Sequence, residues 1–394
     1  MNVLFVLYSL PNLVESSMYS DLVNEFRKNG HNIYPIAPSR SLTSKSFLSI
    51  ENSTEVLRVK TIDVFSKNLI KKGLANILLP VQFKKAFKKY WKDISYDAII
   101  VATPSVMFAD FVFYLKQKSK AKVYLMQKDI FPQNAVDLGM MTNNSFLYKY
   151  FKRKEVKLLR TADFIGCTSP ANITYLLKNN NFLLTKNLHL LYNSSNILHI
   201  KPDLSKFNQL GLEKKFVVVF GGNMGKPQQL ENVLYLAKKC TVYDDVVFLI
   251  IGSGTQAEYL KTTSKRCNLN NLIFINPLRR DEYFSLIAAC NVGLISLHQD
   301  FTVPNTPMKL NDYLNASLPV LASIDRNNDL GVILLENKMG LYAFADSPNE
   351  LFNRFEELYS DREKCKEYGR NGYLFCKENM STSVSYKTIT SYLS

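Results

Sequence analysis

No apolar stretch of this sequence is as long as a membrane-spanning helix. Such a helix needs roughly 20 apolar residues, whereas the longest apolar runs, such as VVFLIIG at 246–252, are far shorter. The first residues, MNVLFVLYSLP, have neither a basic n-region nor a small-residue cleavage site, so they predict a buried strand and not a signal peptide. We therefore expect a cytoplasmic protein that is soluble or bound peripherally to a membrane.

The cysteines are too widely spaced for a familiar metal or redox motif. None of them occurs as C-x-x-C, and we interpret all of them as reduced and structural: Cys167, Cys240, Cys267, Cys290, Cys365 and Cys376. The adjacent Asp244 and Asp245 precede an expected strand, and we do not interpret them as metal ligands. No metal site is predicted.

Acidic residues are outnumbered, 34 against 49 lysines and arginines, which gives a formal net charge of +15. Such an excess favours an anionic partner. The basic residues concentrate at 67–92, a segment without any acidic residue, and again at 147–160. Because no recognised nucleic-acid motif accompanies the charge, nucleic acid is disfavoured as that partner.

Aromatic residues recur at helical spacing within 67–92 and form one face of the expected helix, with lysines on either side. This pattern is typical of an interfacial membrane helix. For this segment and for 147–160 alike, a core helix with a solvated lysine face is the alternative to docking on anionic lipid, and the sequence leaves both interpretations open. On the lipid-docking interpretation the residues that contact an anionic membrane are Lys84, Lys85, Phe87, Lys88, Lys89 and Trp91.

Short apolar strands alternate with amphipathic helices through most of the chain, which predicts an α/β fold with doubly wound parallel sheets. A length of 394 residues suits two domains of similar size. The pattern restarts after a polar, basic linker at 201–215, so we expect one domain at 1–200 and another at 201–375. The final segment, 376–394, is expected to be a helix that can cross back onto the first domain.

A glycine-rich turn, FGGNMG at 220–225, follows the first strand of the second domain. Gly221, Gly222 and Gly225 permit close backbone approach, and a helix expected to begin near Pro227 would direct its dipole at a phosphate. Such turns also occur for purely geometric reasons. The spacing is not G-x-G-x-x-G, and no acidic residue ends the next strand, so a dinucleotide oxidoreductase is disfavoured.

The stretch FTVPNTPMKLNDYL at 301–314 combines residues suited to a nucleotide. Pro307 fits the first turn of a helix, whose free amides can bind a diphosphate. Lys309 adds a charge-assisted contact, and Asp312 lies on the same helix face, where it could hold ribose hydroxyls. The alternative for Lys309 and Asp312 is an exposed ion pair.

Several segments together resemble family 4 glycosyltransferases with the GT-B fold, notably bacterial enzymes that build capsule and O-antigen repeat units. The similar segments, in the family's order, are MQKDIFPQNAVDLGM at 126–140, TADFIGCTSP at 161–170, GGNMGKPQQL at 221–230 and PNTPMKLNDYLNASLPVLAS at 304–323. The resemblance implies two Rossmann-like domains, an N-terminal one for the acceptor and a C-terminal one for the nucleotide-sugar donor.

The activity that the resemblance implies is retaining transfer of a hexosyl or N-acetylhexosaminyl group from a nucleotide diphosphate donor, and we expect a UDP-sugar. The implied acceptor is a saccharide linked to polyprenyl diphosphate at the inner face of the plasma membrane, with no metal or cofactor. Asp312 takes the place of the family's ribose-binding glutamate, while Pro304 stands where its first glutamate would be. Asn223 and Gln228 replace the basic pair that commonly holds the diphosphate, so we assign that role to Lys309, Lys226 and the amides of Gly222 and Asn223.

Other residues acquire roles by position in the same resemblance. Asp129 would orient the acceptor or donor sugar, with Lys309 as the second candidate catalytic residue; the alternative for Asp129 is a carboxylate that caps the next helix. Pro277 and Leu278 match the position that covers the nucleobase, and His298 is the histidine expected near the donor. The remaining candidates are Ser16 and Ser17 in the acceptor loop.

Two other functions stay open. The missing glutamate at Pro304 favours a non-catalytic, nucleotide-sugar-binding partner in a polysaccharide assembly complex. A nucleotide-sugar epimerase could use a similar scaffold, although the sequence shows no evident set of carboxylates and histidine for proton abstraction at a sugar carbon.

Overall fold

The chain folds into two compact units, which we call the N-terminal unit (Met1–Asn196 with Thr382–Ser394) and the C-terminal unit (Ile197–Ser381). The computed structural model describes residues 1–394 except 41–44, 64–68, 104–105, 199, 201 and 203, and it leaves the side chains of 69–72, 74 and 185 undescribed. The boundary expected at residue 200 thus lies four residues later than the one observed. The start of the expected linker and of the lysine-rich segment lies outside the described residues.

The N-terminal unit is built on an eight-stranded sheet of order β3-β4-β2-β1-β5-β6-β7-β8. All neighbours pair in parallel except β3 and β4. The strands are β1 Asn2–Val6, β2 Asn32–Pro38, β3 Phe47–Glu51, β4 Thr54–Val59, β5 Ala98–Ala102, β6 Lys122–Gln127, β7 Phe164–Cys167 and β8 Asn187–Leu190. The predicted doubly wound architecture is confirmed for this half.

The antiparallel hairpin of β3 and β4 at the sheet edge was not predicted. Its strands pair Glu51 with Thr54, so the loop holds only Asn52 and Ser53. Both loop residues have positive φ, 45° and 60°, as a type I′ turn requires. The turn joins the strands with the twist that hairpins need, and the signal was present as asparagine and serine between two alternating apolar runs.

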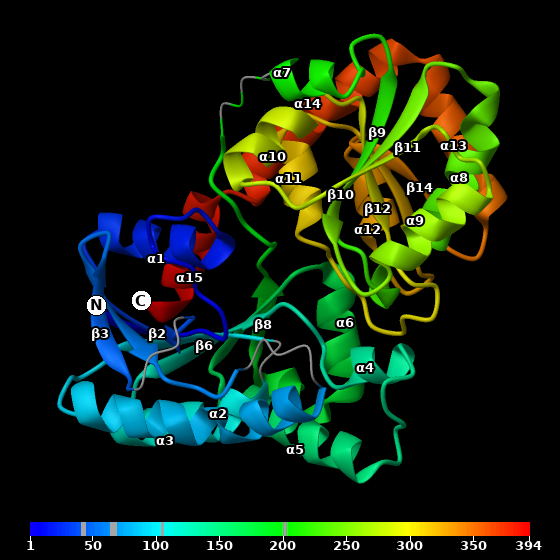
Figure 1. Ribbon diagram of the computed structural model, residues 1–394. Coiled ribbons are helices and arrows are strands. Elements are labelled where there is room, and N and C mark those ends of the chain that lie inside the picture. The colour runs from blue at the N-terminus through cyan, green and yellow to red at the C-terminus, as the bar shows by residue number, and fades with distance from the viewer. Residues whose placement is uncertain (41–44, 64–68, 104–105, 199, 201, 203) are drawn as a thin grey trace. The chain divides into compact units, whose positions relative to one another are not determined.

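Helices cover both faces of this sheet (Figure 1). One face carries α1 and the chain-terminal α15, whose Tyr386 hydroxyl lies 2.9 Å from His31 Nε2. The other face carries α2, α3 and α5, which contact one another in series. The helices are α1 Met18–Lys28, α2 Leu69–Tyr90, α3 Ala109–Ser119, α4 Gln133–Asp137, α5 Phe146–Thr161, α6 Pro170–Asn179 and α15 Thr382–Leu393, with 3₁₀ turns η1 Val106–Phe108 and η2 Asn181–Thr185.

The aromatic face of α2 belongs to the core, so the prediction that Phe87 and Trp91 contact a membrane is wrong. Phe83, Phe87 and Trp91 are each at most 1% exposed. Phe83 and Phe87 pack on Phe111 of α3, at ring-centroid distances of 6.0 and 5.9 Å. The lysines at 84, 85, 88 and 89 lie away from this core, and the three at 85, 88 and 89 are exposed. The core-helix interpretation therefore holds.

The C-terminal unit has an all-parallel six-stranded sheet of order β11-β10-β9-β12-β13-β14. The strands are β9 Phe216–Asn223, β10 Val246–Ser253, β11 Leu272–Ile275, β12 Val292–Ser296, β13 Val320–Ile324 and β14 Gly340–Phe344. The helices are α7 Leu204–Gln209, α8 Glu231–Lys239, α9 Ala257–Arg266, α10 Arg280–Ile287, α11 Lys309–Asn315, α12 Leu330–Glu336, α13 Pro348–Ser360 and α14 Arg362–Asn379, with 3₁₀ turns η3 Lys226–Gln228 and η4 Cys240–Val242.

The cysteines carry no disulfide, and five of the six are buried, while Cys267 is exposed. Burial raises the pKa of Cys167 and of Cys376 to about 12, so both are neutral thiols. Across the described part of the chain, no helix combines the length and apolarity that crossing a bilayer requires.

Replacing Phe87 with alanine should destabilise the N-terminal unit by about 3–5 kcal/mol, because the change leaves a cavity in a closed aromatic core. Trp91 is the sole tryptophan of the chain and lies on the same helix face, so its fluorescence during urea unfolding reports this unit directly. The control is Lys85→Ala on the exposed side of α2, which should stay within about 0.5 kcal/mol of the native protein. An unchanged midpoint for Phe87→Ala would contradict the burial.

Candidate functional site

The carboxyl ends of β9, β10 and β12 meet where the strand order of the C-terminal unit reverses. From β9 the chain proceeds outward to β10 and β11 on one side, and it returns to β12, β13 and β14 on the other. Ligands of open parallel sheets bind at such a reversal, beyond the carboxyl ends of the strands. The glycine-rich turn at 220–225 and the stretch at 301–314 follow β9 and β12, so the fold brings both predicted segments to one edge.

Two glycines set how closely the ends of β9 and β10 approach. Gly222 and Gly252 have φ of +124° and +147°, a region that side chains rarely tolerate. A Cβ on Gly252 would lie 1.9 Å from the carbonyl oxygen of Gly222, and one on Gly254 would lie 2.3 Å from that of Met224. The two loops therefore pack backbone against backbone, and the exposed Gly222 and Asn223 end the strand at an open edge.

The helix expected at Pro227 begins later. Residues Lys226–Gln228 form the 3₁₀ turn η3, and α8 starts at Glu231 after Gln229, whose φ is 39°. Gln229 ties this turn to the end of β12: its carbonyl accepts from Ser296 Oγ at 3.1 Å, and its Oε1 accepts from the Gln299 amide at 2.8 Å. The positive end of the α8 dipole thus lies at Glu231 and not at Pro227.

Lys309 reaches across from α11 to the glycine turn. Its Nζ donates a hydrogen bond to Gln228 Oε1 and stands 3.8 Å from the centroid of the Phe220 ring. Its Cε is 3.7 Å from the point where a Gly222 Cβ would be. Burial among these groups lowers the pKa of Lys309 to about 7, although the nearby Asp312 acts to raise it. A neighbouring anion would restore the full charge.

Asp312 does not form the exposed ion pair with Lys309 that was the alternative expectation. Its Oδ1 faces Arg280 of α10 at 3.7 Å, and its side chain keeps 18% of its surface exposed. Burial raises the pKa of Asp312 to about 6, against the opposing charges of Arg280 and Lys309. The carboxylate and the lysine thus lie near one another, each held by a different partner and each close to its point of titration.

Pro307 is not the first helical residue. The helix α11 begins at Lys309 with Met308 as its N-cap, and Pro307 precedes that cap, where its carbonyl accepts from the Leu310 amide at 3.1 Å. The helix has only seven residues, so its dipole is small. The positive charge that α11 brings to this edge is therefore chiefly that of the Lys309 side chain.

His298 lines a pocket next to the 3₁₀ turn η3, and Lys309 is not among the residues that line this pocket. Its backbone amide donates to the Pro227 carbonyl at 2.9 Å, and its Nδ1 accepts from the Asp300 amide at 3.3 Å. The pocket, about 460 Å³ in volume, is lined by Lys226, Gln229, Glu231, Gln256, His298, Gln299 and Asp300. Lys226 and His298 therefore share one hollow at the end of β9 and β12.

Pro277 and Leu278 form the short connection between β11 and α10, at the same carboxyl edge as the glycine turn. Pro277 is exposed and Leu278 half-buried. The helix that follows them supplies Arg280, which faces Asp312. The connection lies two strands away from β9 in the sheet.

In the N-terminal unit, Asp129 follows β6 at the carboxyl edge of that sheet. It does not cap the next helix, because the N-cap of α4 is Pro132 and has no side-chain hydrogen bond. The Thr103 hydroxyl instead accepts from the amides of Lys128 and Asp129, at 2.8 and 3.0 Å. Burial lowers the pKa of Lys128 to about 7 and raises that of Asp129. Both side chains therefore sit in a desolvated corner.

The two serines predicted for the acceptor loop serve the start of α1. Ser17 is its N-cap and accepts from the Ser20 amide at 3.2 Å. Ser16 is exposed and donates to Asp21 Oδ2 at 2.9 Å. Their hydroxyls thus have structural partners, which is what a serine pair before a helix commonly provides.

Sequence reasoning missed two residues that shape the site. Arg280 faces Asp312, and the Tyr313 hydroxyl accepts from the Gly221 amide at 2.9 Å while donating to the Leu294 carbonyl at 3.2 Å. Tyr313 thereby fixes the end of β9 against β12. The signal for Arg280 was an arginine pair directly after an expected strand end, in NPLRRDEY; the burial of Tyr313 had no local signal.

Comparisons with known proteins find glycosyltransferases. Residues 203–375 match the family described as Glycosyl transferases group 1. A probable glycosyltransferase, WbjE of Pseudomonas aeruginosa, is 24% identical over 298 residues, which span 74% of this chain and 72% of the relative. A chitobiosyldiphosphodolichol beta-mannosyltransferase of Dictyostelium discoideum is 32% identical over 113 residues, or 28% of this chain and 22% of the relative.

The similarity to solved structures extends over both units. Alr3699/HepE of Anabaena, solved in complex with UDP, superposes with a TM-score of 0.72 at 16% identity and covers 100% of this chain and 99% of that chain. At this identity the match shows the fold alone. It shows that fold for the N-terminal unit as well, which the family match does not include.

Replacing Lys309 with methionine should raise the melting temperature, because the native protein removes this ammonium group from water without a carboxylate in direct contact. The folded pKa of about 7 lies below the unfolded value of 10.5, so the cost is complete below pH 7 and disappears as the pH rises towards 10.5. Calorimetry should therefore show a gain in melting temperature that shrinks between pH 7 and pH 10. The exposed Lys226→Met is the control, with little change; a loss of stability in Lys309→Met at pH 7 would contradict this account.

Proposed function

We propose that this chain is a GT-B glycosyltransferase that transfers a sugar from a UDP-sugar to a lipid-linked saccharide. Residues 203–375 match the family described as Glycosyl transferases group 1, and both units have the GT-B fold. The observation that carries the donor half of this proposal is the meeting of Lys309, Asp312 and the Gly222 turn at the reversal point of the C-terminal sheet. It supplies one cation, one carboxylate and free backbone at the place where nucleotides bind in such sheets.

The diphosphate of the donor would take its positive charge from Lys309, with the open backbone at Gly222 and Asn223 beside it. A leaving diphosphate develops negative charge, which a fixed lysine and aligned amides stabilise. We propose no metal in this role. Phosphate binding would displace the Lys309 hydrogen bond to Gln228 or share it, and would favour the protonated ammonium that burial otherwise disfavours.

The ribose would be held by the Asp312 carboxylate, which when ionised can accept hydrogen bonds from ribose hydroxyls at both of its oxygens. Arg280, at 3.7 Å, keeps the carboxylate oriented and favours its charged form. Pro277 and Leu278 would lie against the base, and the pocket with Lys226 and His298 would accept the sugar. In the N-terminal unit we propose that Asp129 orients the sugar or acceptor hydroxyl, in a reaction with retention of configuration.

The lipid-linked acceptor and the place in capsule or O-antigen synthesis are supported by what the relatives act on. One relative's name specifies a diphosphodolichol-linked substrate. A lipid carrier of this kind confines its saccharide to a membrane surface, and the net charge of +15 fits an anionic one. We therefore propose that the enzyme works as a peripheral protein at the inner face of the plasma membrane.

The donor proposal is tested first by nucleotide binding. UDP at a hundred times its dissociation constant should stabilise the folded protein by about 2.7 kcal/mol, which for a unit of this size raises the melting temperature by roughly 5–10 °C. GDP, ADP and CMP should give smaller shifts. In Asp312→Ala the UDP affinity should fall about tenfold to a hundredfold, since a hydrogen bond to a charged group is lost.

The matched control for that variant is Asp281→Ala, an exposed aspartate on α10 whose side chain pairs with Arg279. It should keep the full UDP shift. Equal shifts in native protein and Asp312→Ala would refute the ribose assignment. A UDP shift without sugar turnover on any lipid-linked acceptor would favour the non-catalytic binding partner, and release of an epimerised UDP-sugar would favour the epimerase.

The affinity for UDP should depend on pH through the two titrating groups. It should rise as Asp312 ionises, around pH 6, and fall above about pH 7 as Lys309 loses its proton. The fall can reach about tenfold per pH unit while one proton is taken up on binding. Isothermal titration between pH 5 and pH 9, in buffers of different ionisation enthalpy, measures both the affinity and the proton uptake.

Lys309→Arg separates the two limbs of this profile. Arginine stays protonated throughout the range, so this variant should lose the decline above pH 7 and keep the rise near pH 6. Asp312→Asn should show the reverse pattern at a lower affinity. If the UDP affinity of Lys309→Arg also declined above pH 7, a group other than Lys309 would be responsible for the decline.

A further inference from the structure

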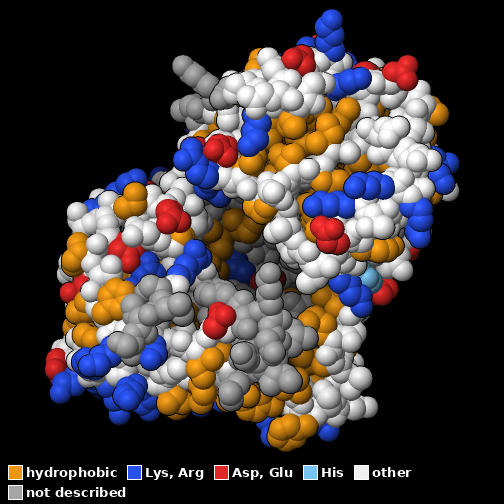
Figure 2. All heavy atoms as spheres, in the orientation of Figure 1, with side chains coloured by type: hydrophobic (Ala, Val, Ile, Leu, Met, Phe, Trp, Pro, Cys, Tyr) orange, Lys and Arg blue, Asp and Glu red, His pale blue; other side chains and the backbone are white. Residues whose placement is uncertain are grey.

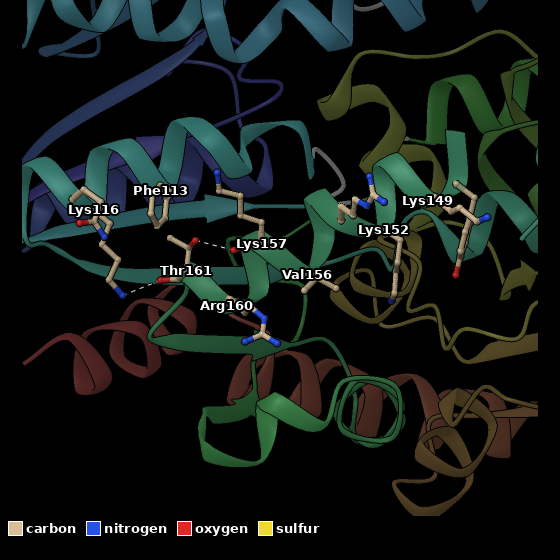
Figure 3. Close-up of a pocket in the computed structure, with 11 residues that line it drawn as sticks. Phe113, Lys116, Lys149, Lys152, Val156, Lys157, Arg160 and Thr161 are labelled. Atoms are coloured by element: carbon tan, nitrogen blue, oxygen red, sulfur yellow. Dashed lines mark hydrogen bonds between the residues drawn. The ribbon is translucent and has the colours of Figure 1, made fainter. Parts of the chain in front are cut away.

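A basic groove with an apolar floor runs between α3 and α5 of the N-terminal unit, well away from Asp129 in sequence and from every residue assigned above. Its volume is about 670 Å³, and its lining is Phe113, Lys116, Gln117, Tyr148, Lys149, Lys152, Arg153, Val156, Lys157, Arg160 and Thr161. Figure 3 shows lining side chains from both helices, with Phe113 and Lys116 on α3 and the other labelled residues on α5; Gln117 also belongs to α3.

Half of the cations in this groove already face carboxylates. Lys116 Nζ lies 2.5 Å from Asp163, Lys152 Nζ 2.5 Å from Glu155, and Lys157 Nζ 2.6 Å from Asp110. The other three form no ion pair with any described residue: Lys149, Arg153 and Arg160. These three side chains are exposed and supply an uncompensated charge of +3 along one helix.

The floor and the near end of the groove are apolar. Phe113 is 42% exposed, and the Lys157 ammonium stands 4.7 Å from the centroid of its ring. Phe146, the first residue of α5, is 83% exposed, and Leu147 is 46% exposed. Large apolar side chains this exposed, beside unpaired cations, are unusual on a surface that meets only water.

The groove follows the axis of α5 from Tyr148 to Thr161, which corresponds to roughly 20 Å at 1.5 Å per residue. At one end of the groove, the Tyr148 hydroxyl donates to Gln133 Oε1 at 3.3 Å. Gln133 belongs to α4, the helix that follows the Asp129 loop. The groove thus starts on the side of the sheet where Asp129 lies. In Figure 2, lysine and arginine side chains gather at the left end of the N-terminal unit, with hydrophobic side chains exposed along its lower edge.

We propose that this groove is a docking site for an anionic phospholipid bilayer, with lipid phosphates at Lys149, Arg153 and Arg160 along α5 and the Phe146 side chain in the acyl region. A phosphate suits the unpaired cations, and a hydrocarbon chain suits the floor. A nucleic acid would satisfy the charge but not the exposed Phe146 and Leu147. This inference rests on the proposed function only in taking the acceptor's membrane as the occupant.

Of the two basic segments that the sequence offers for an anionic membrane, this site uses the second, 147–160, and not the first. The aromatic face of α2 is core, so that helix has no apolar side to insert. Its lysines nevertheless border the same surface, because Lys84 and Lys88 lie 4.0 and 5.7 Å from the Tyr114 ring of α3, one residue beyond Phe113. They add to the attraction of an anionic bilayer, while the groove provides the specific contact.

The test is co-sedimentation of the full chain with vesicles of phosphatidylglycerol and phosphatidylcholine, without nucleotide or acceptor. The triple variant Lys149→Gln, Arg153→Gln, Arg160→Gln should bind anionic vesicles about a hundredfold more weakly, since each cation near the surface contributes roughly a fivefold factor. Phe146→Ser should weaken binding in a manner that added salt does not reproduce. Neither variant removes a buried side chain, so both should fold.

The matched control removes three exposed lysines of the C-terminal unit, by Lys238→Gln, Lys265→Gln and Lys377→Gln, with the same loss of net charge. It should bind vesicles within about twofold of the native protein. Equal losses in the two triple variants would overturn the proposal, because only net charge would then matter. The proposal would also be overturned if the native protein did not bind anionic vesicles, or if it bound an oligonucleotide of equal charge more tightly than the vesicles.

The outcome is independent of the donor site. The groove variants should keep the full thermal shift with UDP, which reports the C-terminal unit and needs no vesicle. If UDP did not raise the melting temperature of the native protein while vesicle binding was intact, only the proposed donor would be refuted. Intact UDP binding with unchanged vesicle binding in the groove variant would refute the docking site alone.

Discussion

The candidate site depends on the contact between the ends of β9 and β10, where the carbonyl of Gly222 occupies the space that a side chain at Gly252 would need. Only a glycine at that place lets the two loops pack so closely. The packing fixes the direction of the turn after β9, and the Tyr313 hydroxyl holds the same turn from the β12 side. The exposed end of β9 then faces Lys309, and a ligand can reach the backbone of Gly222 beside the lysine.

That arrangement explains why Lys309 tolerates partial loss of water. The lysine packs on Phe220 and reaches Gln228 rather than Asp312, so its charge has a neutral acceptor and an aromatic face but no carboxylate in contact. A carboxylate in contact would stabilise the apo protein and compete with an incoming phosphate. Burial of Lys309 thus lowers the stability of the protein but leaves a cation that an anionic ligand can bind. Perturbed pKa values of this kind are common at functional sites.

The sequence was sufficient for the parallel part of both sheets, the glycine turn and the spacing of Lys309 and Asp312, because these follow from local periodicity and from the rule that parallel strands end at one edge. It was insufficient for Phe87 and Arg280, whose roles depend on partners distant in the chain. An aromatic stripe flanked by lysines has the same pattern whether it faces a bilayer or, as here, Phe111 of another helix. The start of α8 was misplaced because a proline can open a 3₁₀ turn as readily as a helix.

The two units repeat one chemical motif at equivalent edges of their sheets. Each has a lysine whose pKa burial lowers to about 7, Lys128 in one and Lys309 in the other, and each has an aspartate whose pKa burial raises. Neither pair is within ion-pair distance, although direct contact would relieve part of the cost. In Lys128 and Asp129 the backbone amides of both residues are anchored on Thr103, which holds the side chains where they are. Packing alone would favour apolar residues at both places, and the proposed donor site gives the second pair a use, since an anionic ligand would complete it.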